Sequence, residues 1–141
     1  MHRVPLTVNQ IKYNMQHIPG LYFAQSDISG RGMFSIEDIP KGSLIEICPV
    51  IVLPEGEVSV IHETRLHDYY FSWGIDQKKC AIALGYGSVY NHAKDSNAEY
   101  DLNLEEETIS IVSVKKISAG EEITINYNGE SGDEGKVWFE K

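Results

Sequence analysis

Two short segments decide the fold of this chain: Tyr90-Asn91-His92-Ala93-Lys94-Asp95-Ser96-Asn97 and Gly120-Glu121-Glu122-Ile123-Thr124-Ile125-Asn126-Tyr127. The first places an amide beside an imidazole, and the second ends on a tyrosine. A third segment, Gly30-Arg31-Gly32-Met33-Phe34, lies upstream of both. Its two glycines leave the main chain bare, so that a ligand can approach backbone N–H and C=O groups closely. On its own, such a glycine pair would more simply indicate a hairpin turn.

In this order and at this spacing, the three segments resemble the signature segments of the SET domain. Proteins of that family transfer methyl groups from S-adenosylmethionine to the lysine side chains of proteins. The resemblance extends from about residue 20 to Tyr127 and, more loosely, to Phe139. We therefore expect an N-terminal extension at residues 1–19, a SET domain at residues 20–128 and a C-terminal tail at residues 129–141.

The length of the chain and its pattern of apolar and turn residues predict one mostly β domain. A chain of 141 residues can bury one core of its own. From Leu21 onward, short apolar runs are separated by glycine and proline, which is typical of β-strands, and residues 98–114 alternate like a hairpin. Residues 55–68 have the clearest helical pattern, with acidic side chains early and basic ones late. We expect several small sheets with one or two short helices.

The resemblance also implies a specific fold, which the pattern of apolar and turn residues cannot predict. It implies the β-clip fold of SET domains, in which the small sheets are curved and the C-terminal segment is threaded beneath a preceding loop. Threading of this kind is rare among folds in general.

Composition excludes several classes of function. The net charge of −9 argues against a nucleic-acid backbone as the main partner, because phosphate binding requires a basic face. No apolar run approaches the roughly 20 residues that a membrane span needs, and the first residues lack the apolar core of a secretory signal. We expect an intracellular protein, cytoplasmic in a bacterium or nuclear in a eukaryote or virus. Cys48 and Cys80 lack zinc spacing and are expected to be buried thiols.

The resemblance implies a role for each signature segment. The segment that begins at Gly30 would line the cofactor pocket through its main chain, and Asn91 and His92 would hold the methionine part and the adenine of S-adenosylmethionine by hydrogen bonds. The residues implied to bind the cofactor are Gly30, Arg31, Gly32, Met33, Asn91 and His92. Tyr127 would be the catalytic tyrosine at the point of methyl transfer. Without the resemblance, His92 would be taken for a structural histidine and Tyr127 for a packed strand-end tyrosine.

Further positions are implied to contact the substrate lysine. Tyr69 matches a tyrosine of the lysine channel, although the alignment can slip by one residue to Tyr70. Ile125 stands where related enzymes often carry an aromatic residue that limits the number of methyl groups added. Trp138 in the tail is expected either to form an aromatic lid or to be an exposed residue, with the two alternatives evenly balanced.

The sequence also departs from the family pattern. Ala93 replaces a usual serine, and Lys94-Asp95 stands where many members carry a zinc-binding cysteine. We therefore expect a compact, zinc-free SET protein without a metal site, similar to small viral and bacterial members. Gly85-Tyr86-Gly87 is not followed by a long helix, which argues against a nucleotide-binding glycine loop. These glycines are expected to shape the turn that leads to Asn91 and His92.

The leading hypothesis is a protein-lysine methyltransferase that acts on a lysine-rich protein, such as a histone-like or ribosomal protein. A catalytically silent SET-fold module that binds a peptide or partner is the main alternative. Methylation of a non-protein amine is a third hypothesis, and the sequence leaves homodimer formation open. In the mechanism that we expect, no side chain acts as general base. Tyr127 instead orients the amine while the nearby sulfonium charge lowers the pKa of the lysine.

Overall fold

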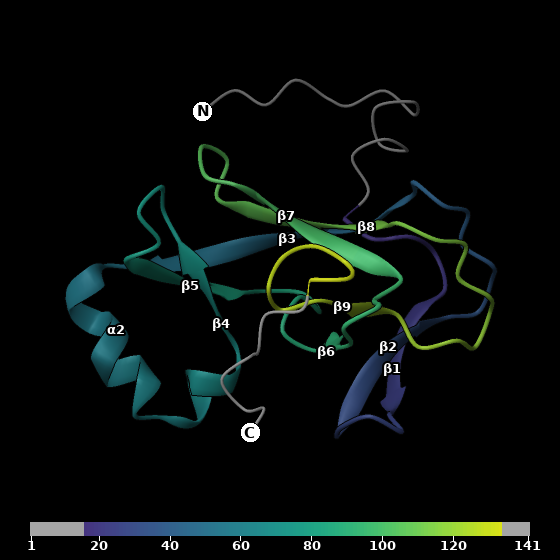
Figure 1. The fold of residues 1–141 in the computed structure, drawn as a ribbon, viewed down its shortest axis with the longest axis horizontal. Coiled ribbons are helices and arrows are strands. Elements are labelled where there is room, and N and C mark those ends of the chain that lie inside the picture. The colour runs from purple at the N-terminus through teal and green to yellow at the C-terminus, as the bar shows by residue number, and fades with distance from the viewer. Residues whose placement is uncertain (1–15, 134–141) are drawn as a thin grey trace, which may run out of the picture.

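The structure is a computed structural model that describes residues 16–133. It is mostly β, and α2 lies beside β5 at one end while the β1–β2 hairpin lies at the other (Figure 1). The elements are β1 (Leu21–Gln25), β2 (Arg31–Ser35), β3 (Leu44–Leu53), α2 (Glu55–His62), η1 (Arg65–Asp68), β4 (Tyr70–Trp73), β5 (Lys79–Ala83), β6 (Asn91–His92), β7 (Ala98–Asn103), β8 (Thr108–Ser113) and β9 (Thr124–Ile125). The expected fold class is confirmed.

The largest sheet has five antiparallel strands in the order β4-β5-β3-β8-β7. Its long strand β3 pairs with β8 through residues 44–49 and with β5 through residues 50–53, so that β3 joins two halves of the sheet. Strands β7 and β8 form the expected hairpin, with Ala98 opposite Ser113 and Asn103 opposite Thr108. The outer strands of the sheet are β4 and β7, and residues of both strands line one cavity.

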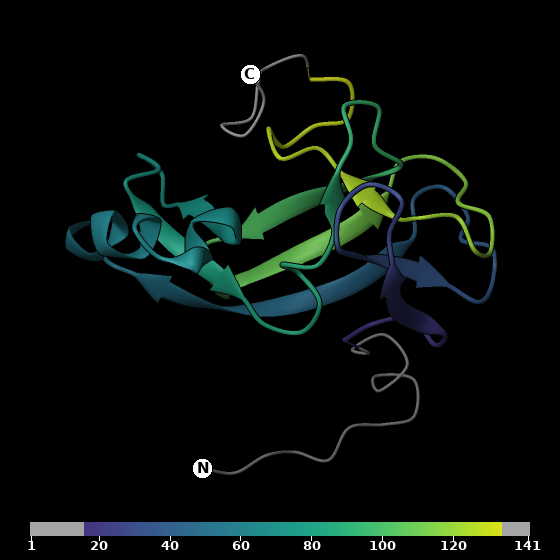
Figure 2. The same ribbon diagram turned by 90° about the horizontal axis from the view of Figure 1, so that it is seen from below.

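Two smaller sheets bring the signature segments together. Strands β1 and β2 form a hairpin, and β6 pairs in parallel with β9, with Asn91 opposite Thr124 and His92 opposite Ile125. The carbonyl of Met33 accepts a hydrogen bond from the Ile123 N–H at 2.8 Å, which connects the segment of residues 30–34 to the segment of residues 120–127. From below, β6 and β9 lie side by side near the C-terminal part of the described chain (Figure 2).

The C-terminal segment runs back along the loop that follows β6. The N–H of Gly132 donates to the Lys94 carbonyl at 2.7 Å, and the Ser131 hydroxyl donates to the Ser96 carbonyl at 2.6 Å. The Asn126 amide spans this contact, because it donates to the carbonyls of Lys94 and Asp133. Residues 1–15 and 134–141 lie outside the described part, so the predicted boundaries of the extension and tail stay predictions.

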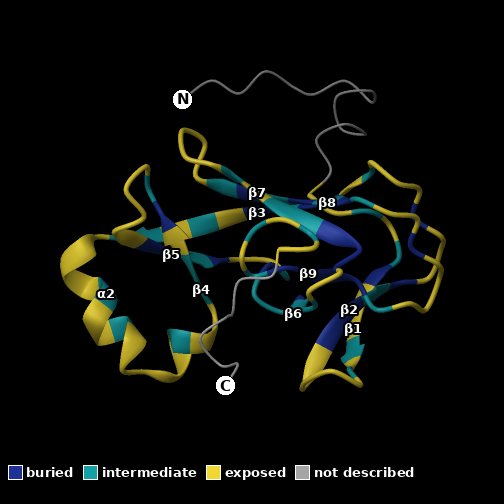
Figure 3. Ribbon diagram, in the orientation of Figure 1, coloured by how far each residue is buried: buried dark blue, intermediate teal, exposed yellow. Residues whose placement is uncertain are grey.

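The predicted helical region is divided in two. The α-helix α2 ends at His62, and the Thr64 hydroxyl then accepts a hydrogen bond from the Leu66 N–H at 3.1 Å at the start of the 3₁₀ turn η1. Helix α2 has no buried residue and is almost wholly exposed (Figure 3). Within residues 16–133, no helix has the length and apolarity that a membrane crossing requires.

The core is formed by strand residues that face inward. On β8, Ile109 and Ile111 alternate with less buried neighbours, as expected for a sheet with one face on the core. Met33, Ile123 and Ile125 are also fully buried, so the core lies directly beneath the signature segments. Cys48 and Cys80 are buried free thiols, as predicted.

Candidate functional site

The backbone pairing of β6 with β9 places His92 beside Tyr127. The Ala93 N–H donates to the Ile125 carbonyl at 3.0 Å, and the Tyr127 N–H donates to Nδ1 of His92 at 3.0 Å. Because Nδ1 accepts this bond, a ring proton of His92 must lie on Nε2. The rings of His92 and Tyr127 are 5.1 Å apart between centroids.

Two cavities meet at Tyr127. The larger, about 530 Å³, is here called the Arg31 cavity, and the smaller, about 430 Å³, the Tyr100 cavity. Four residues line both of them: Asp68, Tyr69, Ser88 and Tyr127. The remaining residues of the Arg31 cavity are Ile28, Ser29, Gly30, Arg31, Val89, Asn91 and His92. The structure thus gathers Gly30, Arg31, Asn91 and His92, all predicted to bind the cofactor, around one hollow.

The amide of Asn91 is held by a cluster of oxygen atoms. Its Nδ2 lies 2.8 Å from Oε2 of Glu122, 2.9 Å from the Ser29 carbonyl, and 3.1 Å from both the Arg31 carbonyl and the Ser26 hydroxyl. The Ser26 hydroxyl donates in turn to the other oxygen of Glu122 at 2.6 Å. Two amide hydrogens therefore face four oxygens, and the amide can offer a ligand only its Oδ1 acceptor.

Gly32 and Met33 do not line the cavity, although both were predicted to bind the cofactor. A Cβ at Gly32 would overlap the carboxylate of Glu122. The bare backbone at this position therefore admits a side chain of the protein. Met33 is fully buried, and its carbonyl is used by the Ile123 N–H. Both residues support neighbours that face the cavity, and their own roles in cofactor binding stay predictions.

Arg31 supplies positive charge to the larger cavity. Among the described residues that line it, Arg31 is the only lysine or arginine. Its guanidinium lies 5.4 Å from the centre of the Phe23 ring, a cation–π distance that holds the side chain near the hairpin. Such a group suits a ligand that carries a carboxylate.

The hydroxyl of Tyr127 is a neutral donor turned toward the protein. It donates to the Tyr90 carbonyl at 2.8 Å. Burial, and next the neighbouring Tyr69, Asp68 and Glu122, together raise the pKa of Tyr127 to about 12. The phenol therefore stays protonated at neutral pH. Because its proton points at Tyr90, its oxygen can offer an incoming group only an acceptor.

The Tyr100 cavity lies between the two outer strands of the large sheet. Tyr70, Phe71 and Ser72 come from β4, and Tyr100 and Leu102 come from β7. The rings of Phe71 and Tyr100 pack edge to face, with centroids 5.1 Å apart. Among the described residues that line this cavity there is no lysine or arginine. An aromatic, cation-free wall of this kind suits a ligand with a positive charge.

The predicted substrate residues are placed differently from one another. Tyr69 lines both cavities, whereas Tyr70 lines only the Tyr100 cavity and its hydroxyl lies 2.9 Å from Nδ1 of His62. Ile125 is fully buried in β9 and lines neither cavity, because its side chain packs into the core. Trp138 lies outside the described residues.

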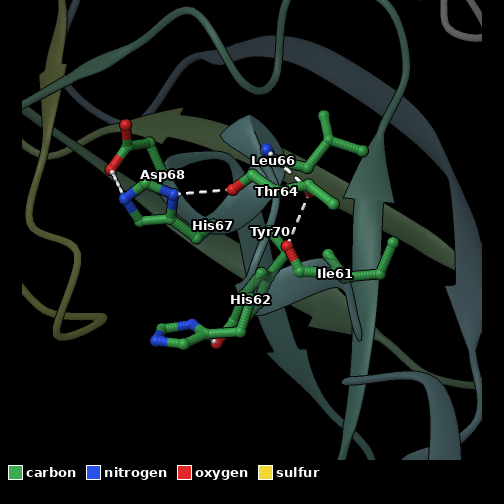
Figure 4. A network of polar contacts seen from close by, with 7 residues as sticks. All are labelled: Ile61, His62, Thr64, Leu66, His67, Asp68 and Tyr70. Carbon is green, nitrogen blue, oxygen red and sulfur yellow. Dashed lines mark hydrogen bonds and ion pairs between the residues drawn. The ribbon is translucent and has the colours of Figure 1, made fainter. Parts of the chain in front are cut away.

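Asp68 is a site residue that the sequence analysis missed. It is the only carboxylate among the described residues lining either cavity. His67 fixes it, because Nε2 lies 3.1 Å from the Asp68 carboxylate while Nδ1 lies 2.7 Å from the Thr64 carbonyl (Figure 4). Other residues of the site that the sequence analysis did not assign include Ser88, Tyr90, Tyr100 and Glu122. Only the position of Asp68 directly before Tyr69 could have suggested it.

Residues 30–128 match the family described as the SET domain. The chain belongs to the SET domain family. The match contains all three signature segments, so the resemblance stated from the sequence is confirmed. Within residues 16–133 no group of three or more His, Cys, Asp or Glu is placed to hold a metal ion. That this SET domain is zinc-free stays a prediction.

Relatives of known name agree with the assignment to the SET domain. A histone-lysine N-methyltransferase of Schizosaccharomyces pombe, specific for H3 lysine-37, is 32% identical over 121 residues, covering 85% of this chain and 77% of that protein. A Plasmodium falciparum protein assigned as a histone methyltransferase has a solved structure with a TM-score of 0.62 and 28% identity, covering 78% of this chain and 98% of that one.

A third likeness supports the SET fold alone. Polycomb repressive complex 2 of Chaetomium thermophilum, solved in an autoinhibited conformation with S-adenosylmethionine, gives a TM-score of 0.64 at 22% identity. The likeness covers 77% of this chain and 15% of that one.

Proposed function

We propose that this protein methylates a lysine of a histone-like protein, with the cofactor in the Arg31 cavity and the lysine in the Tyr100 cavity. Membership of the SET family and the named relatives confirm the broader prediction of a protein-lysine methyltransferase that uses S-adenosylmethionine. The observation that carries the finer proposal is the meeting of two cavities at Tyr127. A donor and an acceptor of a methyl group must meet at one such point.

The larger cavity fits S-adenosylmethionine in size and chemistry. Its volume of about 530 Å³ lies within the roughly 300–1,000 Å³ typical of small-molecule sites. Arg31 suits the carboxylate of the methionine part, and Oδ1 of Asn91 suits the ammonium beside it. When bound, the cofactor supplies a methyl group on a positively charged sulfur.

For methyl transfer, the amine of the substrate lysine must first lose its proton. A lysine of ordinary pKa, about 10.4, pays roughly 4 kcal/mol to lose its proton at neutral pH. Positive charge nearby and removal from water both lower that pKa. Tyr127 is no base, because its phenol is protonated and its hydrogen is directed at Tyr90. Its oxygen can instead accept an N–H of the amine, which turns the nitrogen lone pair toward the Arg31 cavity. In-line positioning of this kind can supply several kcal/mol.

The substrate segment is proposed to lie extended across the Tyr100 cavity. Each outer strand, β4 and β7, pairs on one side only within the sheet, so each presents an edge for β-type pairing. The chain carries a net charge of −9, which favours encounters with a lysine-rich tail. A histone-like tail meets both requirements, and a ribosomal protein is the second candidate.

A methyl-transfer assay on histones and ribosomal proteins, read by mass spectrometry, tests this function. We expect a mass gain of one or more methyl groups on a lysine, with Tyr127→Phe as the matched inactive control. Binding of S-adenosylmethionine without transfer to any protein would instead support the silent binding module. Transfer only to small amines would support the third hypothesis.

Salt should weaken the encounter with the substrate. Exposed charges are screened over about 8 Å at physiological ionic strength, so we expect KM for a lysine-rich peptide to rise steadily from low to high salt. The value of kcat should change little, because the bound amine lies in a sheltered cavity. Steady-state kinetics across a salt series measures this, and a constant KM would indicate a small or apolar substrate.

Tyr69 and Tyr70 should behave differently when each loses its hydroxyl. Tyr69 faces both cavities, so Tyr69→Phe should lower kcat by the equivalent of one hydrogen bond, about 0.5–1.5 kcal/mol, or change the number of methyl groups added. Tyr70→Phe loses only its contact with His62 and should leave the product distribution unchanged. Mass spectrometry of the product separates these outcomes. The reverse pattern would show that Tyr70 is the channel residue.

A further inference from the structure

Strand β3 carries a buried carboxylate that lines neither cavity. Glu46 is 2% exposed, and both of its oxygens accept hydrogen bonds. The Tyr90 hydroxyl donates to Oε1 at 2.7 Å, and the Tyr86 N–H donates to Oε2 at 2.9 Å. A carboxylate is costly to bury and is retained only where such partners compensate it. The hydrogen bonds from Tyr90 and Tyr86 therefore compensate the burial of Glu46.

The glycine loop of the sequence closes over this carboxylate. Gly85 has φ +63°, and a Cβ there would lie 2.6 Å from Oε2 of Glu46. A Cβ at Gly87 would lie 2.6 Å from the Ala83 Cβ and 3.0 Å from the Cys48 sulfur. Glycine at both positions lets the loop pack onto β3. As a result the Tyr86 N–H reaches Glu46, and the chain continues directly into Tyr90 and Asn91.

Tyr90 connects this carboxylate to the reaction point. Its hydroxyl binds Glu46, while its carbonyl accepts the hydroxyl proton of Tyr127 at 2.8 Å. Tyr90 is 1% exposed, so its ring has little room to move. Burial, and next the Glu46 carboxylate, raise the pKa of Tyr90 well above its usual value near 10, which keeps this hydroxyl a donor. Tyr90 is thereby held at its side chain by Glu46, and this fixes the position of its carbonyl, which Tyr127 contacts.

We propose that Glu46 is a positioning residue for methyl transfer, acting through Tyr90 on the direction of the Tyr127 hydroxyl. The proposal rests on the proposed role of Tyr127. The carbonyl of Tyr90 decides where the phenol proton points, and so where the oxygen lone pairs face. Small misplacements of a group at a reacting centre reduce the rate strongly.

The test measures Tyr90→Phe and Glu46→Gln, each alone and combined with Tyr127→Phe. Alone, each should lower kcat by about tenfold while the dissociation constant of S-adenosylmethionine and the peptide KM stay within about twofold. In the Tyr127→Phe background, neither should lower kcat further, because the hydroxyl that they position is already absent. Tyr22→Phe is the matched control, since it removes a hydroxyl from an exposed tyrosine of β1 that lines neither cavity, and it should keep the activity of the unmodified protein.

Several results would overturn the proposal. An equal fractional loss of kcat in both backgrounds, or no loss in either, would show that Glu46 and Tyr90 have only a structural role. If Glu46→Gln does not fold, Tyr90→Phe carries the test alone, since it removes one oxygen atom from a ring that stays packed.

A second measurement does not depend on residual activity. The NMR signal of the Tyr127 ¹³Cζ should shift in Tyr90→Phe and stay unchanged in Tyr22→Phe, and an unshifted signal in Tyr90→Phe would overturn the proposal. Failure of the proposed function is distinguishable, because Tyr127→Phe would then show no defect itself.

Discussion

Replacing Tyr127 by phenylalanine is expected to lower methyl transfer by about 10²-fold or more, the range seen when one hydrogen-bonding group is removed from a transition state. The substitution keeps the ring and its contact with His92 but removes the oxygen that orients the amine. The dissociation constant of S-adenosylmethionine should stay within about twofold, because the hydroxyl is directed at Tyr90. Single-turnover kinetics and calorimetry measure the two quantities separately.

The pH dependence provides a control on this role. Burial raises the pKa of Tyr127 to about 12, so kcat should show no inflection from this phenol across the neutral range. The rate should rise with pH only through deprotonation of the substrate lysine. Because the folded pKa lies above the unfolded value of about 10, the neutral phenol stabilises the fold below pH 10, and this contribution is lost as pH rises toward 12. An inflection near neutral pH that Tyr127→Phe removed would instead make Tyr127 a base.

Replacing Asn91 by alanine is expected to raise the dissociation constant of S-adenosylmethionine by about 10- to 100-fold. The change removes Oδ1 from the cavity and leaves the Glu122 carboxylate without its 2.8 Å donor. Glu122 is half-buried and keeps the hydrogen bond from Ser26, so thermal stability should fall by only about one hydrogen bond, roughly 0.5–1.5 kcal/mol. Asn103→Ala, which changes an exposed asparagine at the end of β7 outside both cavities, is the control.

Calorimetry on the unmodified protein and on Asn91→Ala measures the effect. The unmodified protein should bind S-adenosylmethionine in the micromolar range, with or without a metal chelator. Loss of binding in chelator would contradict a metal-free site. Unchanged affinity in Asn91→Ala would remove Asn91 from the cofactor site.

Local patterns were sufficient for much of the fold. Alternating residues predicted the β7–β8 hairpin, and acidic residues followed by basic ones predicted α2, because both signals act over a few residues. The three signature segments were expected to act together, and the structure places them in hydrogen-bonded contact. The parallel pairing of β6 with β9 joins segments about thirty residues apart, which periodicity alone cannot predict.

The site shows why spacing predicts some roles and misses others. The bare backbone at Gly32 correctly indicated a close approach, but the approaching group is the Glu122 carboxylate, from the far end of the chain. Tyr100 comes from a different strand again, and only the curvature of the sheet brings it to Phe71. Ile125 turns inward because its strand faces the core at that register. Each of these contacts depends on which distant segment packs against the residue, and the local sequence does not predict that packing.

The meeting of two separately lined cavities also has a consequence for the order of events. Residues 87–92 contribute to both cavities, whereas the β1–β2 hairpin lines only the Arg31 cavity and strands β4 and β7 line only the Tyr100 cavity. With the cofactor in one cavity and the lysine in the other, as proposed, spent cofactor could leave and a fresh molecule enter while the substrate lysine stays bound. Such a layout allows several rounds of transfer to one side chain during a single encounter. The protein would then work processively, with the residence time of its substrate setting how far each lysine is modified.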